Sequence, residues 1–274
     1  MKKLAEFDWA REAGGDFLAA LSFLSVLAPP VEGSSNKFGR ALVWFGAAGF
    51  LIGALSSAGA AIFCLVLRAL SSAPEILIAL FGGWTWICIE IFLTRGLHWD
   101  GIADLGDGLG SGARGDKFWI ILKDSRLGTF GALALFLLVM GDAILASAHL
   151  LEALAADALG QSFLLSLAPA WGRLAPIWMG ARLKAWPHSG LGRMVCENIS
   201  IGTRIGTALI AVAILVLAFA SGTSAVGVVC LACAEAALIL GLNRIASSRG
   251  GLSGDFFGAG IEVSQFLFIF FSLF

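Results

Sequence analysis

The sequence predicts an all-α polytopic membrane protein. Of its 274 residues, 58% are hydrophobic and only 14% are charged, whereas soluble domains carry about 25% charged residues. The mean hydropathy is +0.90, and apolar runs long enough to cross a bilayer recur along the chain. We therefore expect one integral-membrane domain over residues 1–274.

Seven apolar stretches have the length of a membrane-spanning helix. They cover residues 41–67, 74–93, 127–150, 162–181, 205–220, 224–242 and 256–274. An earlier apolar stretch, residues 17–30, ends in Pro29 and Pro30 and is too short to span easily. We expect about seven transmembrane helices preceded by a short interfacial or re-entrant segment.

The basic residues divide between alternate connections of this arrangement. Sixteen of the eighteen fall before the first span or after the second, fourth and sixth, and the exceptions are Arg68 and Arg173. Because Lys and Arg concentrate in cytoplasmic loops, we expect the N-terminus and these loops in the cytoplasm and the C-terminus outside. The net charge of −1 gives no indication of binding to nucleic acid.

An aspartate-rich stretch, TRGLHWDGIADLGDGLGSG, follows the second expected span at residues 94–112. Asp100, Asp104 and Asp107 are spaced i, i+4 and i+7, which places them on one face of a helix. Like charges on one face repel unless a cation lies between them, and hard divalent cations prefer oxygen ligands. We predict a Mg²⁺ site here, with a solvated helix end as the alternative.

Two further stretches on the same expected side supply complementary groups. In KDSRLG, residues 123–128, a lysine and an arginine flank an aspartate and a serine at a helix start, which suits phosphate and metal binding. Snorkelling cations with a capping residue are the alternative. After GGLSG, Asp255 and Glu262 again share one helix face. The three stretches together predict a divalent-metal site for a polyphosphate substrate.

Four ionisable residues fall at apparent membrane depth, where charged groups are costly and usually paired or functional. They are Glu90, Asp142, Arg173 and Glu235. Glu90 and Arg173 can line the predicted site. Asp142 and Glu235 fit either a structural pair or a position near an interface.

Three segments of the chain resemble, in the same order, the signature segments of a known family. They are HWDGIADLGDG, LKDSRLGTFGALAL and GGLSGDFFGAGIE. The family is that of the cobalamin synthases, the adenosylcobinamide-GDP ribazoletransferases. The similarity covers nearly the whole chain. It implies a Mg²⁺-dependent transferase of the bacterial inner membrane. Such an enzyme joins adenosylcobinamide-GDP to α-ribazole or α-ribazole 5′-phosphate and releases GMP. The oligomeric state is open, and a homo-oligomer is one option.

The resemblance also implies roles for individual residues. The implied metal ligands are Asp100, Asp104, Asp107, Asp124 and Asp255. The implied catalytic residues are His98, Asp104 and Asp107, with either His98 or an aspartate as the general base and an orienting role as the alternative for His98. The implied contacts to substrate and phosphate are Lys123, Ser125, Arg126 and Glu262.

The chain departs from the family pattern at several positions. Residues 25–28 replace a Thr-Arg-x-Pro motif, an arginine usual near Pro187 is missing, Arg95 replaces a glycine, and Gln265 replaces a glutamate. Two other classes of membrane protein share part of this pattern. A CDP-alcohol phosphotransferase would need a different continuation after Asp100, and a transporter would need internal repeats, which the sequence lacks.

Overall fold

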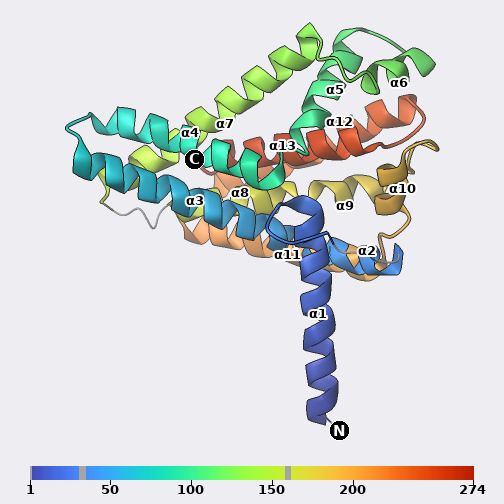
Figure 1. The fold of residues 1–274 in the computed structure, drawn as a ribbon, viewed down its shortest axis with the longest axis horizontal. Helices are drawn as coiled ribbons and strands as arrows, with labels where there is room; N and C mark the ends of the chain where they lie inside the picture. Colours follow the sequence, from blue (N-terminus) through green and yellow to red (C-terminus); the bar gives the residue numbers. More distant parts are fainter. Residues whose placement is uncertain (1, 31–34, 158–161) are drawn as a thin grey trace.

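The computed structural model describes residues 2–30, 35–157 and 162–274, and over these residues it is helical with no strand (Figure 1). One isolated bridge joins Ala185 to Leu252. The predicted all-α class is thereby confirmed. The helices are α1 (Lys2–Leu24), α2 (Ser35–Ala41), α3 (Phe45–Leu70), α4 (Glu75–Thr94), α5 (Trp99–Gly110), α6 (Asp116–Leu122), α7 (Thr129–Ala155), α8 (Phe163–Gly172), α9 (Ala175–Gly180), α10 (Gly190–Cys196), α11 (Ile201–Ala220), α12 (Ala225–Ser248) and α13 (Gly254–Phe271), with a 3-10 turn, η1 (Leu42–Trp44), before α3.

Six helical segments among the described residues are long and apolar enough to cross a membrane. They are Phe38–Leu70, Glu75–Thr94, Thr129–Ala155, Ile201–Ala220, Ala225–Ser248 and Gly254–Phe271. These segments make the chain a multi-pass membrane protein, close to the predicted count of about seven.

The expected continuous span over residues 162–181 is wrong in one respect, because it is divided into α8 and α9. Pro169 lies inside α8 and Pro176 lies at the start of α9, and proline lacks the N–H that a continuous helix requires. The two short helices follow one another along nearly the same direction (Figure 1). The break leaves Arg173 and Leu174 between them, at the centre of the molecule.

Small residues allow α8 to sit in the middle of the bundle. Gly49 and Gly53 of α3 face the backbone of α8, where an added Cβ would collide with the carbonyl groups of Pro169 and Ser166. Close helix contacts through small residues are typical of membrane proteins, since lipid supplies no hydrophobic drive for helix association. All of α8 from Leu164 to Gly172 is buried.

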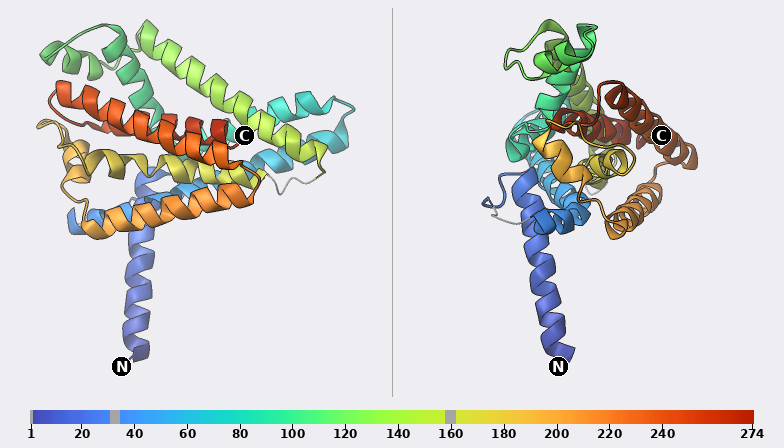
Figure 2. Two further views of the ribbon diagram at one scale, coloured as in Figure 1. Left: turned by 180° about the vertical axis from the view of Figure 1, so that it is seen from behind. Right: turned by 90° about the vertical axis from the view of Figure 1, so that its right-hand side faces the viewer.

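α1 runs across the direction of the spanning helices and projects from one flank of the bundle (Figures 1 and 2). It is not among the six candidate spans. The expected short segment over residues 17–30 is therefore the end of α1 followed by an extended turn. That turn is fixed where the N–H of Val26 donates to the carbonyl of Leu93 at 2.8 Å.

The short helices α5, α6 and α10 gather at one end of the bundle, together with the end of α12 and the start of α13 (Figure 1, right). We call this the loop end. It contains all three polar stretches singled out in the sequence, residues 94–112, 123–128 and 250–262.

Candidate active site

The aspartate-rich stretch forms the helix α5, as its spacing predicts. A left-handed turn at Arg95 (φ 57°) and Gly96 (φ 63°) separates α5 from α4. This conformation favours glycine, which gives a physical reason for the glycine that is usual at position 95. One side of α5 buries Trp99, Ile102 and Leu105, while the three aspartates stay partly or fully exposed.

Close backbone contact between α5 and α13 brings Asp255 to the aspartates. An added Cβ on Gly101 would lie 2.5 Å from the backbone oxygen of Asp255, and one on Gly258 would lie 2.9 Å from that of His98. Burial and the negative charges of Asp100, Asp255 and Asp107 raise the pKa of Asp104 to about 7. The structure thus assembles what we call the open cluster: Asp100, Asp104, Asp107 and Asp255.

Asp107 also joins the first polar stretch to the second. Its two carboxylate oxygens accept hydrogen bonds from the backbone N–H groups of Gly128, at 2.7 Å, and Gly131, at 2.8 Å. These donors belong to the first turn of α7, where the helix dipole favours a negative charge. Asp107 therefore caps α7 while it faces the other aspartates.

The second stretch lies on the exposed rim of the site. The Lys123 ammonium is 4.7 Å from the ring centre of Trp186, which stacks on Trp119 at 3.9 Å. The Arg126 side chain is 87% exposed and donates to both oxygens of Asp124, the shortest contact being 2.7 Å. These bonds lower the pKa of Asp124 to about 2.

Asp124, a predicted metal ligand, is not among the carboxylates that raise the pKa of Asp104. In this structure its charge is matched by Arg126 instead. Ser125 between them is exposed. Lys123, Ser125 and Arg126 are all exposed, so a ligand can reach them from solvent.

Behind α5 lies a second charged group, which we call the buried network: Glu90, His98, Arg173, Glu262 and Gln265. Arg173 is fully buried in the break between α8 and α9. It donates to Glu90 of α4 and to Gln265 of α13, both at 2.6 Å. Trp99 of α5 donates to the other oxygen of Glu90 at 3.4 Å. The network ties four parts of the bundle together under the open cluster.

His98 and Glu262 meet inside this network and not at the surface. His98 Nδ1 is 3.2 Å from Glu262 Oε1, at an angle that gives no hydrogen bond. Burial and the charge of Arg173 lower the pKa of His98 to about 3, so the imidazole is neutral at neutral pH. Glu262, predicted to contact substrate, has no exposed surface.

Asp142 and Glu235, for which the sequence left two interpretations, do not pair with each other. Glu235 accepts hydrogen bonds from Trp171, at 3.1 Å, and Ser264, at 2.8 Å. Asp142 is completely buried in α7, and neither of its oxygens has a hydrogen-bond partner among the described residues.

A cavity of about 230 Å³ opens beside the open cluster, between α1, α5, α10 and α13. His98, Asp100 and Asp255 line its polar side. Its apolar side includes residues that sequence reasoning missed, namely Phe23, Leu24, Leu191 and Val195. The family resemblance includes FLSVLAPP at residues 23–30 and GLG at residues 190–192, but it assigned no role to these apolar residues.

The donor chemistry of the open cluster fits a hard divalent cation. Four carboxylates come from two helices, and their mutual repulsion raises a pKa, which a cation would relieve. Over residues 2–30, 35–157 and 162–274, no three acidic, histidine or cysteine side chains converge closely enough to hold a metal as they stand. Binding would therefore require these carboxylates to turn toward the ion.

The fold and the site define a class: an integral-membrane protein with an acidic, solvent-open site and basic groups at one end of a helical bundle. The family model described as cobalamin-5-phosphate synthase matches residues 16–273, and the chain belongs to this family. This confirms the resemblance found in the signature segments. The two other classes, CDP-alcohol phosphotransferase and transporter, are set aside by the match.

Relatives from several bacteria carry the name adenosylcobinamide-GDP ribazoletransferase. A protein of Nitratidesulfovibrio vulgaris strain DP4 is 35% identical over 246 residues, covering 88% of this chain and 90% of the relative. A protein of Klebsiella pneumoniae is 34% identical over 266 residues, covering 92% and 97%. One from Brevibacillus brevis is 30% identical over 266 residues, covering 91% and 94%. No solved structure matches the chain.

Proposed function

We propose that the chain is an adenosylcobinamide-GDP ribazoletransferase, which joins adenosylcobinamide-GDP to α-ribazole or its 5′-phosphate and releases GMP. The family match over residues 16–273 supports this reaction. One observation supports the open cluster as the place of this reaction. Asp255, in the last signature segment, lies close to Asp100 and Asp104, which belong to the first signature segment. Acidic groups beside basic ones suit a reaction at a pyrophosphate.

We further propose that Asp100, Asp104, Asp107 and Asp255 hold Mg²⁺. When bound, the ion would supply neutralisation of phosphate charge during an in-line displacement. Asp107 is fixed by the first turn of α7, so Asp100, Asp104 and Asp255 are the carboxylates left to adjust. We assign Asp124 to holding Arg126, since the two are already in contact.

Lys123 and Arg126 are assigned to the phosphate groups. Stacking on Trp186 places the Lys123 ammonium at the rim of the site, and the exposed Arg126 can present its donors to phosphate oxygens. Ser125 lies between them and can add a hydroxyl donor. Glu262 is unsuited to this role, because it is buried and carries the wrong charge for phosphate.

His98 is assigned an orienting role. An imidazole with a pKa of about 3 is a weak base at neutral pH. His98 lies in the wall of the cavity, held between Glu262 and the backbone of Gly258. The proton of the attacking hydroxyl would then pass to an aspartate of the open cluster, whose members reach solvent.

The deciding experiment measures GMP release by the purified protein in detergent or lipid. Adenosylcobinamide-GDP is supplied with α-ribazole or its 5′-phosphate, with Mg²⁺ and with EDTA. We expect GMP and a cobalamin product with Mg²⁺, and loss of both with EDTA that is restored by added Mg²⁺. No product with either acceptor from folded protein would refute the reaction. Product formation that persists in EDTA would refute the requirement for Mg²⁺.

We place the protein in the bacterial inner membrane with the loop end toward the cytoplasm, as the distribution of basic residues supports. If α8 and α9 together make a seventh crossing, the two termini lie on opposite sides. A C-terminal alkaline phosphatase fusion should then be active and a C-terminal fluorescent protein dark. The reverse result would contradict this orientation of the protein.

A further inference from the structure

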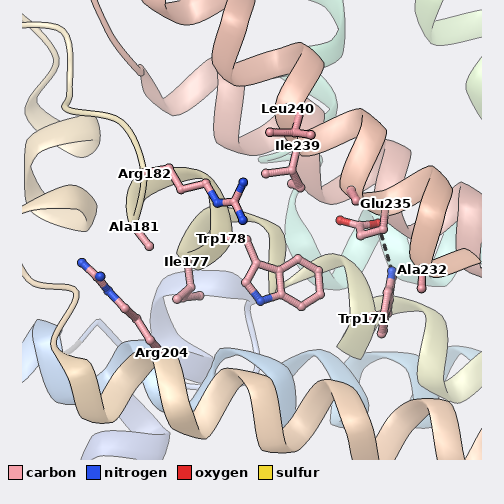
Figure 3. A pocket seen from close by; sticks show the side chains of 11 residues that line it. Trp171, Ile177, Trp178, Ala181, Arg182, Arg204, Ala232, Glu235, Ile239 and Leu240 are labelled. Atoms are coloured by element: carbon pink, nitrogen blue, oxygen red, sulfur yellow. Dashed lines mark hydrogen bonds between the residues drawn. The ribbon is translucent and has the colours of Figure 1, made fainter.

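A second cavity, of about 420 Å³, lies between α8, α9, α11 and α12 (Figure 3). Its lining is mainly apolar and includes Ile177, Trp178, Ile239 and Leu240. It is distinct from the cavity beside the open cluster, because α9 separates them. Pro176 faces that first cavity, whereas Ile177 and Trp178 face this one.

Two arginines stand at one end of the second cavity. Arg182 lies two residues after the end of α9, Arg204 lies in the first turn of α11, and both line the cavity. Figure 3 shows the Arg182 side chain extending above Trp178. Over the described parts of the chain, neither guanidinium has an ion-pair or hydrogen-bond partner. Two unpaired cations at the rim of an apolar cavity suit an amphipathic ligand that has an anionic group and an apolar part.

The cavity opens toward the lipid. It lies against α11 and α12, which are both candidate spans. Leu240 lines it and is 54% exposed, so the cavity reaches the outer face of α12. From Ala232 to Leu240 the cavity follows α12 for about 12 Å at 1.5 Å per residue. A chain entering from the bilayer can therefore lie along this helix.

The single acidic residue of the lining does not oppose an anion at the arginines. Glu235 lies across Trp178 from Arg204, and its carboxylate is directed to Trp171 (Figure 3). Its oxygens are engaged by Trp171 and Ser264, and it is only 4% exposed. The cavity is thus positively charged at the loop end, where the two arginines lie. At its other end the carboxylate of Glu235 is already hydrogen-bonded.

We propose that this cavity binds an anionic phospholipid, with its phosphate at Arg182 and Arg204 and an acyl chain along Trp178, Ile239 and Leu240. Basic pockets between membrane helices bind anionic headgroups in this way. Such a lipid would fill the space between α11 and α12 and connect both helices to α9. The proposal does not depend on the reaction assigned to the open cluster.

Native mass spectrometry of the full-length protein, titrated with phosphatidylglycerol or phosphatidylcholine, tests this proposal. We expect phosphatidylglycerol to bind more tightly. In the double variant Arg182→Gln/Arg204→Gln its affinity should fall about 30-fold, since each arginine contributes about 1 kcal/mol. Phosphatidylcholine binding should stay unchanged. The matched control is Arg114→Gln/Arg244→Gln, which removes two charges outside the cavity and should leave both lipids unaffected.

A second variant separates the cavity from its charges. Ala236→Phe places a ring into the lining and should weaken retention of phosphatidylglycerol with both arginines intact, while an unchanged melting temperature verifies folding. Three outcomes would overturn the proposal: equal affinity for the two lipids, an unchanged affinity in the Arg182→Gln/Arg204→Gln protein, or displacement of the lipid by inorganic phosphate or adenosylcobinamide-GDP. The last would assign the cavity to a soluble ligand.

Discussion

The open cluster and the buried network are both built from charged residues of α5, α13 and their neighbours, yet they differ in charge balance and in access to water. The open cluster has four carboxylates and no cation among the groups acting on Asp104, and its members are partly or fully exposed. The buried network surrounds Arg173 with Glu90 and Gln265 at 2.6 Å, away from solvent.

The open cluster has the properties of a binding site, whereas the buried network has those of a structural element. Uncompensated charge that reaches solvent can take up a cation at little structural cost. In the buried network the compensated charge is the Arg173–Glu90 pair, whereas neither oxygen of Glu262 has a hydrogen-bond partner among the described residues. Such a buried pair is expensive to break, because each desolvated ion costs several kcal/mol when its partner is removed. We therefore expect changes in the open cluster to alter activity and metal binding, and changes in the buried network to alter stability first.

The largest effect is expected for Asp104→Asn in the open cluster. Metal-assisted stabilisation of phosphate charge contributes several kcal/mol, so kcat/KM for GMP release should fall about 1,000-fold or more. The melting temperature of the metal-free protein should not fall, because the variant removes repulsion with Asp100 and Asp255. Near-normal turnover would contradict the metal assignment.

Next in size is Arg173→Met in the buried network. Removal of this guanidinium leaves Glu90 buried without its partner, and we expect a loss of about 3–5 kcal/mol in unfolding free energy. Denaturant unfolding in detergent measures it. The double variant Arg173→Met/Glu90→Gln should recover part of the loss, because no unpaired buried charge remains. A single variant as stable as the unmodified protein would show that the ion pair is not structural.

A smaller effect is expected for Gly101→Ala, which changes no charge. The added Cβ would lie 2.5 Å from the backbone oxygen of Asp255, so α5 and α13 must move apart at a cost of about 1–3 kcal/mol. Turnover should fall as Asp255 leaves the cluster. Gly241→Ala is the matched control, since its Cβ meets nothing within 4 Å. If both variants behave alike in a thermal melt, the close contact has no energetic role.

The smallest effect concerns pH. Asp104 has a pKa of about 7 in the folded protein, above its value of about 3.9 in an unfolded chain. The proton that Asp104 binds more tightly in the folded state therefore stabilises the metal-free protein. This stabilisation is fully present below about pH 4 and is lost as pH rises through 7. Mg²⁺ competes with this proton, so Mg²⁺ affinity should rise by up to about tenfold per pH unit below 7.

Melting curves at pH 6 and pH 8, with and without Mg²⁺, measure both trends. The metal-free protein should lose stability toward pH 8, while the rise in melting temperature on adding Mg²⁺ should be larger at pH 8. Asp104→Asn should flatten both trends, and Asp116→Asn, an aspartate outside the cluster, should not. A stabilisation by Mg²⁺ that is independent of pH would separate Asp104 from the metal.

The sequence by itself determined the class, the family and most of the open cluster. Apolar runs predicted the spans because each helix must bury its backbone polar groups within lipid. The i, i+4, i+7 spacing predicted the aspartate face of α5 because helix geometry is local.

Only the tertiary structure decided what these groups meet. The sequence did not show that α8 and α9 break at Arg173, that Asp107 caps α7, or that Glu262 is enclosed with His98. It also gave no sign of the cavity between α9, α11 and α12. Apart from the break, which Pro169 and Pro176 explain locally, these features depend on contacts between helices far apart in the chain, such as α5 with α7 and with α13. Periodicity specifies which face of a helix is polar, whereas packing specifies which other helix that face meets.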